Sequence, residues 1–142
     1  MRYILDADTV SFALRGEGGL VLITGEAGIG KSRLVRELHR GVRAERWFEA
    51  RCVAEQQENP LRPFIDILVG LGQPLEAVLA HHGFDLAETM PLFATLLPDQ
   101  VGTRYADLPL TPDRMRELTL ATLLSLFLRM AQGRPMVLAI ED

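Results

Sequence analysis

The chain has 142 residues, of which 48% are hydrophobic and 24% charged, with a formal net charge of −4. This length suits one domain with a core and excludes two ordinary domains, and the acidic balance gives no indication of a nucleic-acid surface. Cys52 is the only cysteine, which excludes a disulfide framework. No apolar run is long enough to span a membrane, and Asp6 and Asp8 interrupt the N-terminal apolar stretch where a signal peptide would lie. We therefore expect a cytoplasmic protein without membrane or direct nucleic-acid contacts.

The first residues form a leader with its own character. Tyr3–Leu5 predicts a short strand that ends at Asp6, and Val10–Leu14 predicts a short helix. Residues 1–16 resemble the opening of PIN-domain toxin nucleases, which implies that Asp6 would help to bind Mg²⁺. A two-metal nuclease needs several converging carboxylates, and the later PIN acids have no counterpart downstream. We expect residues 1–17 to be a PIN-like leader rather than a complete domain, and a remnant of a metal-dependent ribonuclease is the alternative.

The next stretch combines a strand, a glycine-rich loop and a helix. Leu20–Thr24 is an apolar run that predicts a buried strand. The eight residues that follow, Gly25–Ser32, fit the P-loop (Walker A) pattern G-x-x-x-x-G-K-S/T. Residues 33–44 have apolar side chains at helical spacing and predict the helix that the motif requires.

Each residue type in this loop suits phosphate binding. The glycines allow the backbone to turn its N–H groups toward an anion, and the helix dipole points at the same place. Lys31 would reach the β- and γ-phosphates, and the Ser32 hydroxyl would bind Mg²⁺. Lys31 is the only lysine of a chain that otherwise uses arginine. The candidate nucleotide-binding residues are Gly25, Glu26, Ala27, Gly28, Ile29, Gly30, Lys31, Ser32 and Arg33.

The middle of the chain predicts one strand and several helices. Trp47–Val53 carries aromatics and predicts a second strand, in which we expect Cys52 to be buried. His81 and His82 are expected to be surface residues rather than metal ligands, since adjacent helical residues do not face each other. Thr111 and Pro112 form a helix start, and a wide apolar face on that helix predicts extensive packing. Helices are expected over residues 63–71, 75–82, 86–97 and 111–132, with a loop over 101–110.

The last stretch is an apolar strand that ends in two acids. Met136–Ile140 predicts a buried strand, and Glu141 and Asp142 follow it. This pattern downstream of a P-loop fits a Walker B element. Glu141 would hold Mg²⁺ together with Ser32, and Asp142 is where a base that orients the attacking water would lie. Glu141 and Asp142 are therefore the candidate catalytic residues.

Residues 18–142 resemble the N-terminal part of an AAA-like ATPase module of the STAND class, as found in signalling proteins with cyclase or LuxR-type output domains. The resemblance implies an α/β P-loop fold, ATP and Mg²⁺ as cofactors, and a role as an ATP-dependent switch in signal transduction. The matching segments are Gly25–Val35, Arg51–Cys52 with Pro63–Asp66, Leu108–Pro112 and Arg134–Asp142.

The resemblance also implies what lies outside the chain. Family members continue past the acidic pair into further strands, sensor residues, an arginine finger and a winged-helix lid. We therefore expect an incomplete parallel sheet flanked by helices, which binds nucleotide without efficient hydrolysis. Self-association through exposed sheet edges is a further expectation, and a non-functional gene fragment is the alternative.

Overall fold

The computed structural model describes residues 19–41, 46–52, 60–105 and 107–141. The chain divides into two compact units. One contains the described residues up to Glu49 and residues 131–141, and the other contains the described residues from 50 to 130. Among the described helices, none is long and apolar enough by itself to cross a membrane. Two short helices, Arg62–Gly70 and Leu75–His81, pass that test only as a pair bent by 87°.

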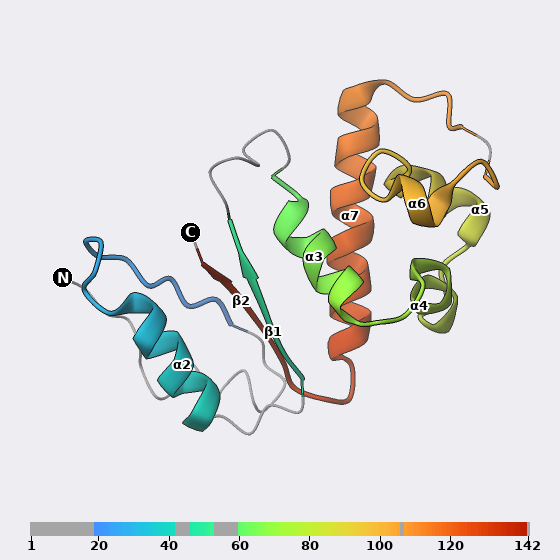
Figure 1. Ribbon diagram of the computed structural model, residues 1–142. Helices are drawn as coiled ribbons and strands as arrows, with labels where there is room; N and C mark the ends of the chain where they lie inside the picture. Colours follow the sequence, from blue (N-terminus) through green and yellow to red (C-terminus); the bar gives the residue numbers. More distant parts are fainter. Residues whose placement is uncertain (1–18, 42–45, 53–59, 106, 142) are drawn as a thin grey trace. The chain divides into compact units, whose positions relative to one another are not determined.

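Two strands pair with each other, and most of their residues belong to the first unit. β1 (Arg46–Arg51) and β2 (Met136–Glu141) form a two-stranded sheet, and they run in parallel in Figure 1. Both strands were predicted from their apolar and aromatic content, and both are confirmed within one or two residues. Val53, the last residue of the predicted strand Trp47–Val53, lies outside the described residues.

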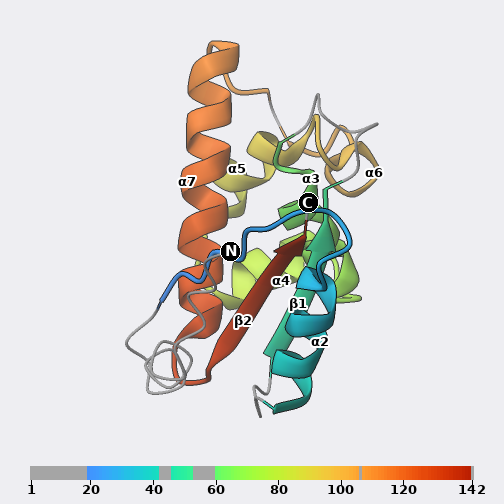
Figure 2. The same cartoon turned by 90° about the vertical axis from the view of Figure 1, so that its left-hand side faces the viewer.

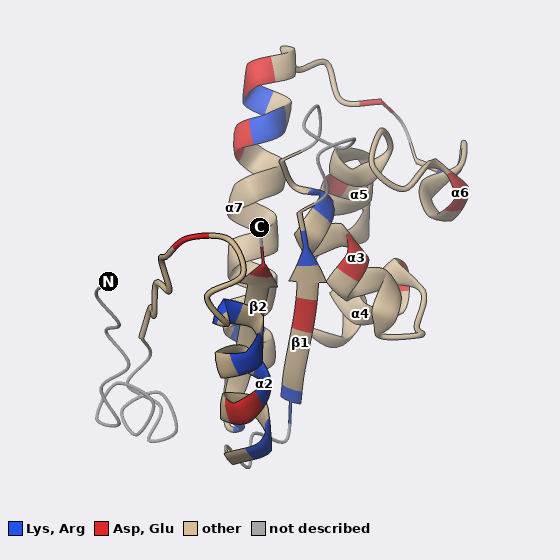
Figure 3. Cartoon of the chain, turned by 60° about the vertical axis from the view of Figure 1, so that its left-hand side comes forward, with Lys and Arg blue, Asp and Glu red and all other residues tan. Residues whose placement is uncertain are grey.

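Helix α2 (Lys31–Gly41) follows the glycine-rich loop. Its apolar side chains at positions 34, 35 and 38 are half-buried, and its arginines are exposed. Figure 3 shows these arginines in blue along the helix. No residue of α2 is fully buried, so the helix is held by partial contacts rather than by a core of its own.

The segment before the loop is not the buried strand that the sequence predicts. Ile23 forms an isolated bridge, and the rest of Leu20–Thr24 is irregular. Leu20 is 91% exposed and Leu22 is 71% exposed. A strand is stable only when its backbone is paired along its length and its side chains are covered. Among the described residues only β1 and β2 form a sheet, so an apolar pattern alone does not produce a strand here.

Helices make up the second unit, and Figures 1 and 2 show them from two sides. Its largest fully buried side chains are Phe93, Ile65, Leu79, Met90, Leu123, Leu126 and Val101. In chain order the helices are α3 (Arg62–Gly70), α4 (Leu75–His81), α5 (Leu86–Thr89), the 3₁₀-helix η2 (Met90–Phe93), α6 (Pro98–Val101) and α7 (Pro112–Ala131).

The single helix predicted over residues 86–97 is broken into two pieces. Asp85 begins α5, because its carboxylate accepts hydrogen bonds from the N–H groups of Ala87 at 2.8 Å and Glu88 at 3.3 Å. Pro91 lacks the N–H that an α-helix needs there, and the chain continues as the 3₁₀-helix η2. Pro98 directly follows the predicted helix over residues 86–97, and it occupies the first turn of α6, a position that proline tolerates.

Helix α7 confirms the predicted start but only part of the predicted apolar face. The Thr111 hydroxyl accepts a hydrogen bond from the N–H of Arg114 at 3.3 Å. Leu123 is buried, whereas its neighbour Leu124 is 60% exposed. The buried stripe of the helix consists of Thr119, Leu123, Leu126, Phe127 and Met130. Leu120 and Leu128 are also more than half exposed, so the helix packs as expected, but only part of its wide apolar face is covered.

Candidate functional site

The glycine-rich loop adopts backbone angles that only glycine takes easily. Gly28 has φ 77° and Gly30 has φ 102°, and beyond the neighbouring residues in the chain nothing lies within 4 Å of the position that a Cβ would occupy at either residue. At Gly25 an added Cβ would lie 3.1 Å from Cγ2 of Ile29. The Ile29 N–H donates to the Glu26 carbonyl at 3.4 Å and closes the turn. The glycines at these positions thus have a local structural reason.

The side chain of Lys31 lies across this loop. Its ammonium donates hydrogen bonds to the carbonyl oxygens of Gly25 at 2.9 Å and Glu26 at 3.0 Å. An ammonium group has three N–H donors, so one more remains for an anion. The structure therefore brings together the first two residues of the motif and its lysine. The contact of Lys31 with the β- and γ-phosphates stays a prediction.

The N-terminus of α2 adds a second source of positive potential. The first turn contains Lys31, Ser32 and Arg33, with no acidic residue to neutralise the helix dipole. The Leu34 N–H donates to the Gly30 carbonyl at 3.0 Å, which joins the helix directly to the loop. Ser32 and Arg33 are exposed. Open glycines, an ammonium and a helix N-terminus together suit an anionic phosphate group.

The acidic end of the last strand supplies a second set of predicted residues. Glu141 is half-buried and ends β2, which extends one residue further than predicted. The Ser32 hydroxyl and a carboxylate are the oxygen donors that Mg²⁺ prefers, so the chemistry of these residues fits the metal. Within the described part of the chain, no three His, Cys, Asp or Glu side chains are grouped to hold a metal. Asp142 lies outside the described residues, and its role stays a prediction.

Other candidates from the sequence have different outcomes. Asp6 and Asp8 of the leader lie outside the described residues. Cys52 is exposed, so the expectation of a buried strand cysteine is wrong: β1 ends at Arg51 and leaves Cys52 just beyond the ladder. His81 and His82 pack edge to face, with ring centroids 5.0 Å apart.

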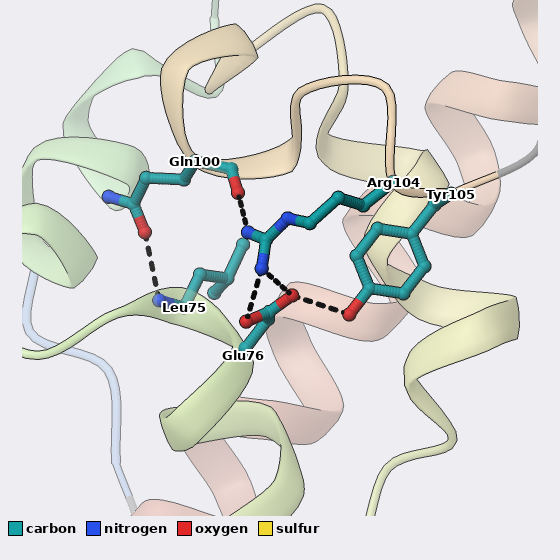
Figure 4. Close-up of polar contacts among 5 residues, drawn as sticks. All are labelled: Leu75, Glu76, Gln100, Arg104 and Tyr105. Atoms are coloured by element: carbon teal, nitrogen blue, oxygen red, sulfur yellow. Dashed lines mark hydrogen bonds and ion pairs between the residues drawn. The ribbon is translucent and has the colours of Figure 1, made fainter.

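The structure also shows a polar cluster that the sequence did not reveal (Figure 4). The Tyr105 hydroxyl donates to Glu76 at 2.6 Å, and Arg104 forms an ion pair with the same carboxylate at 3.0 Å. Arg104 also donates to the Gln100 carbonyl, and the Gln100 side chain accepts from the N–H of Leu75. The contacts between residues 75–76 and residues 100–105 join positions 25 to 29 apart in sequence, and no motif connects them.

This cluster changes the acid–base properties of its members. The hydrogen bond from Tyr105 lowers the pKa of the Glu76 carboxyl, and Arg104 acts in the same direction. The same hydrogen bond raises the pKa of Tyr105, because the phenol must lose the proton that it donates. The cluster borders an open hollow lined by residues of α3, α4 and α6. Its contacts fasten the end of α6 to the start of α4.

Comparison with known proteins identifies the class. Residues 5–142 match the model of the AAA ATPase domain family, and the chain belongs to this family. The match begins within the segment that we describe as a leader. The family match indicates that the chain is a nucleotide-binding ATPase module of the α/β P-loop type.

A curated protein is also similar in sequence. It is the uncharacterized protein R02095 of Rhizobium meliloti (strain 1021), 33% identical over 144 residues. The alignment covers 91% of this chain and 14% of that protein, so the chain spans about a seventh of the relative's length. No solved structure matches the chain.

Proposed function

We propose that the chain binds ATP with Mg²⁺ through the loop of residues 25–32. The contact that carries this proposal is the Lys31 ammonium, which lies 2.9 Å and 3.0 Å from the first two carbonyl oxygens of the loop. That position places a positive charge beside the loop in which Gly28 and Gly30 have positive φ values. Membership of the AAA ATPase domain family supports the same ligand.

Different groups of the loop and of β2 would contact different parts of a bound triphosphate and its Mg²⁺. Backbone N–H groups at the start of α2 donate to phosphate oxygens, and Lys31 supplies a charge-assisted hydrogen bond. The Ser32 hydroxyl and the Glu141 carboxylate are the residues that would hold Mg²⁺. Bound Mg²⁺ neutralises charge on the phosphates. Arg33 is exposed beside the loop and adds positive potential.

Binding without efficient hydrolysis is the second part of the proposal. Phosphoryl transfer depends on several positioned charges around the γ-phosphate and on a residue that orients the attacking water. Lys31 supplies one such charge through its contacts with the loop carbonyls. We assign the water-orienting role to Asp142 and expect turnover slower than about 1 s⁻¹, the low end for typical enzymes.

We further propose that this module belongs to a STAND-type signalling protein. The support is the resemblance of residues 18–142 to such modules and the much greater length of the Rhizobium relative. In this class of switch, the γ-phosphate holds mobile parts in one arrangement and releases them after hydrolysis. The sensed signal and the output would then belong to other parts of the protein.

Calorimetric titration with ATP, with and without Mg²⁺, tests the proposed ligand and metal. We expect Mg²⁺ to tighten binding in the parent chain. Ser32→Ala should reduce this effect of Mg²⁺, because it removes a metal ligand but leaves Lys31 in place. A Ser32→Ala variant with an unchanged response to Mg²⁺ would exclude Ser32 as a ligand.

A further inference from the structure

Three side chains join the last turn of α2 to strand β1. The imidazole of His39 stacks on the indole of Trp47, with ring centroids 4.4 Å apart and planes only 3° from parallel. The indole N–H donates to Oε1 of Glu49 at 2.7 Å, and Nδ1 of His39 lies 3.3 Å from the same oxygen. We call His39, Trp47 and Glu49 the His39 anchor.

The contacts of the His39 anchor depend on each other. Oε1 of Glu49 accepts the indole N–H and lies beside Nδ1 of His39, so one carboxylate contacts both rings. The hydrogen bond from the indole N–H to this oxygen holds Trp47 in the position in which its ring stacks on the imidazole of His39. An aromatic pair in stacking geometry adds stability beyond the area it covers.

The anchor matters because α2 has few other means of attachment. None of its residues is fully buried, and Leu34, Val35 and Leu38 are only half-buried. His39 lies eight residues after Lys31, which is about 12 Å along the helix axis. An α-helix is rigid over this length, so fixing one end also limits how far the other end can move.

We propose that His39 and Glu49 are positioning residues of the nucleotide site. They hold the far end of α2 against β1, and they thereby fix the first turn, which carries Lys31 and Ser32. The effect on nucleotide rests on the proposed function. The attachment of the helix itself does not, and it can be measured in the protein without nucleotide.

The first test uses hydrogen exchange of the α2 amides and the fluorescence of Trp47, the only tryptophan of the chain. In His39→Ala we expect the emission of Trp47 to change and the α2 amides to exchange about three- to tenfold faster. His39→Gln keeps a hydrogen-bond donor but loses the stack, and His39→Phe keeps the stack but loses the donor. Both should give intermediate exchange rates. Unchanged exchange in His39→Ala and Glu49→Gln would overturn the anchor.

The second test measures ATP binding by calorimetry. His39→Ala and Glu49→Gln should each weaken binding about three- to tenfold, and His39→Phe should restore part of the loss. Arg62→Ala removes an ion pair of comparable exposure on α3 and serves as the control, with unchanged affinity expected. Faster exchange with unchanged affinity would refute the positioning role. If the parent chain bound no ATP, the proposed function would fail, and the exchange data alone would decide whether the anchor exists.

Discussion

The ammonium of Lys31 lies 2.9 Å from the carbonyl oxygen of Gly25, six residues earlier in the chain. The contact joins the first residue of the glycine-rich loop to the lysine near its end. It requires a loop backbone that approaches the lysine closely, and this backbone in turn requires glycine at particular positions. The phosphate site is therefore a property of the loop conformation as much as of the lysine.

Gly30→Ala tests this dependence. With φ 102° at this position, an alanine would cost about 1–2 kcal/mol or would move the loop. We expect ATP binding to fall at least tenfold by calorimetry. Gly41→Ala is the matched control, since Gly41 ends α2, is not among the glycines with positive φ, and has open space where a Cβ would lie. If Gly30→Ala bound ATP as tightly as Gly41→Ala, the loop conformation described here would not be the binding conformation.

The loop and most helices follow from local sequence. A P-loop motif specifies its turn through glycine, and helical periodicity specifies α3, α4 and α7 to within one or two residues. The break within residues 86–97 could have been foreseen, because Pro91 removes an N–H donor in mid-helix.

The features that the sequence did not predict depend on contacts between residues far apart in the chain. Leu20–Thr24 has the composition of a strand, but strand formation depends on a partner that a local pattern does not contain. The contact of Glu76 with Tyr105 joins positions 29 residues apart. Which part of the apolar face of α7 is buried depends on how the other helices pack. The sequence does not distinguish Leu123 from Leu124, because both are leucines within the same apolar pattern.

Glu76 and Tyr105 predict a pH dependence. The pKa of Glu76 is lowered on folding, so its contacts stabilise the protein above the unfolded-state pKa of about 4.5 and lose this effect as the pH falls through the folded value. The pKa of Tyr105 is raised from about 10, so its contribution is complete below that pH and is lost in more alkaline solution.

Urea unfolding of the parent chain and of Glu76→Gln, followed from about pH 7 to about pH 3, measures the acid side. The parent should have the higher midpoint near neutral pH, and the difference should shrink below about pH 4.5 as Glu76 becomes protonated. Tyr105→Phe should flatten the acid dependence, because it removes the largest cause of the shift. A difference between parent and Glu76→Gln that is constant over the whole range would contradict this assignment.

Leu123 and Leu124 give a paired test of the α7 packing. Leu123 is 1% exposed, so Leu123→Ala should destabilise the chain by about 2–5 kcal/mol. Leu124 is 60% exposed, so Leu124→Ala should change stability by less than about 0.5 kcal/mol. Denaturant unfolding of both variants measures the difference. Equal destabilisation would mean that α7 packs with a different face.

The most direct measurement is a titration with ATP and Mg²⁺ of the parent chain, Lys31→Ala and Arg62→Ala. Loss of a charge-assisted contact of about 1.5–3 kcal/mol should weaken binding by Lys31→Ala tenfold or more. Arg62→Ala removes a positive charge on α3 and should bind like the parent. Circular dichroism should confirm that all three proteins are folded. Equal affinity of Lys31→Ala and the parent, or no binding by a folded parent, would contradict nucleotide binding by this loop.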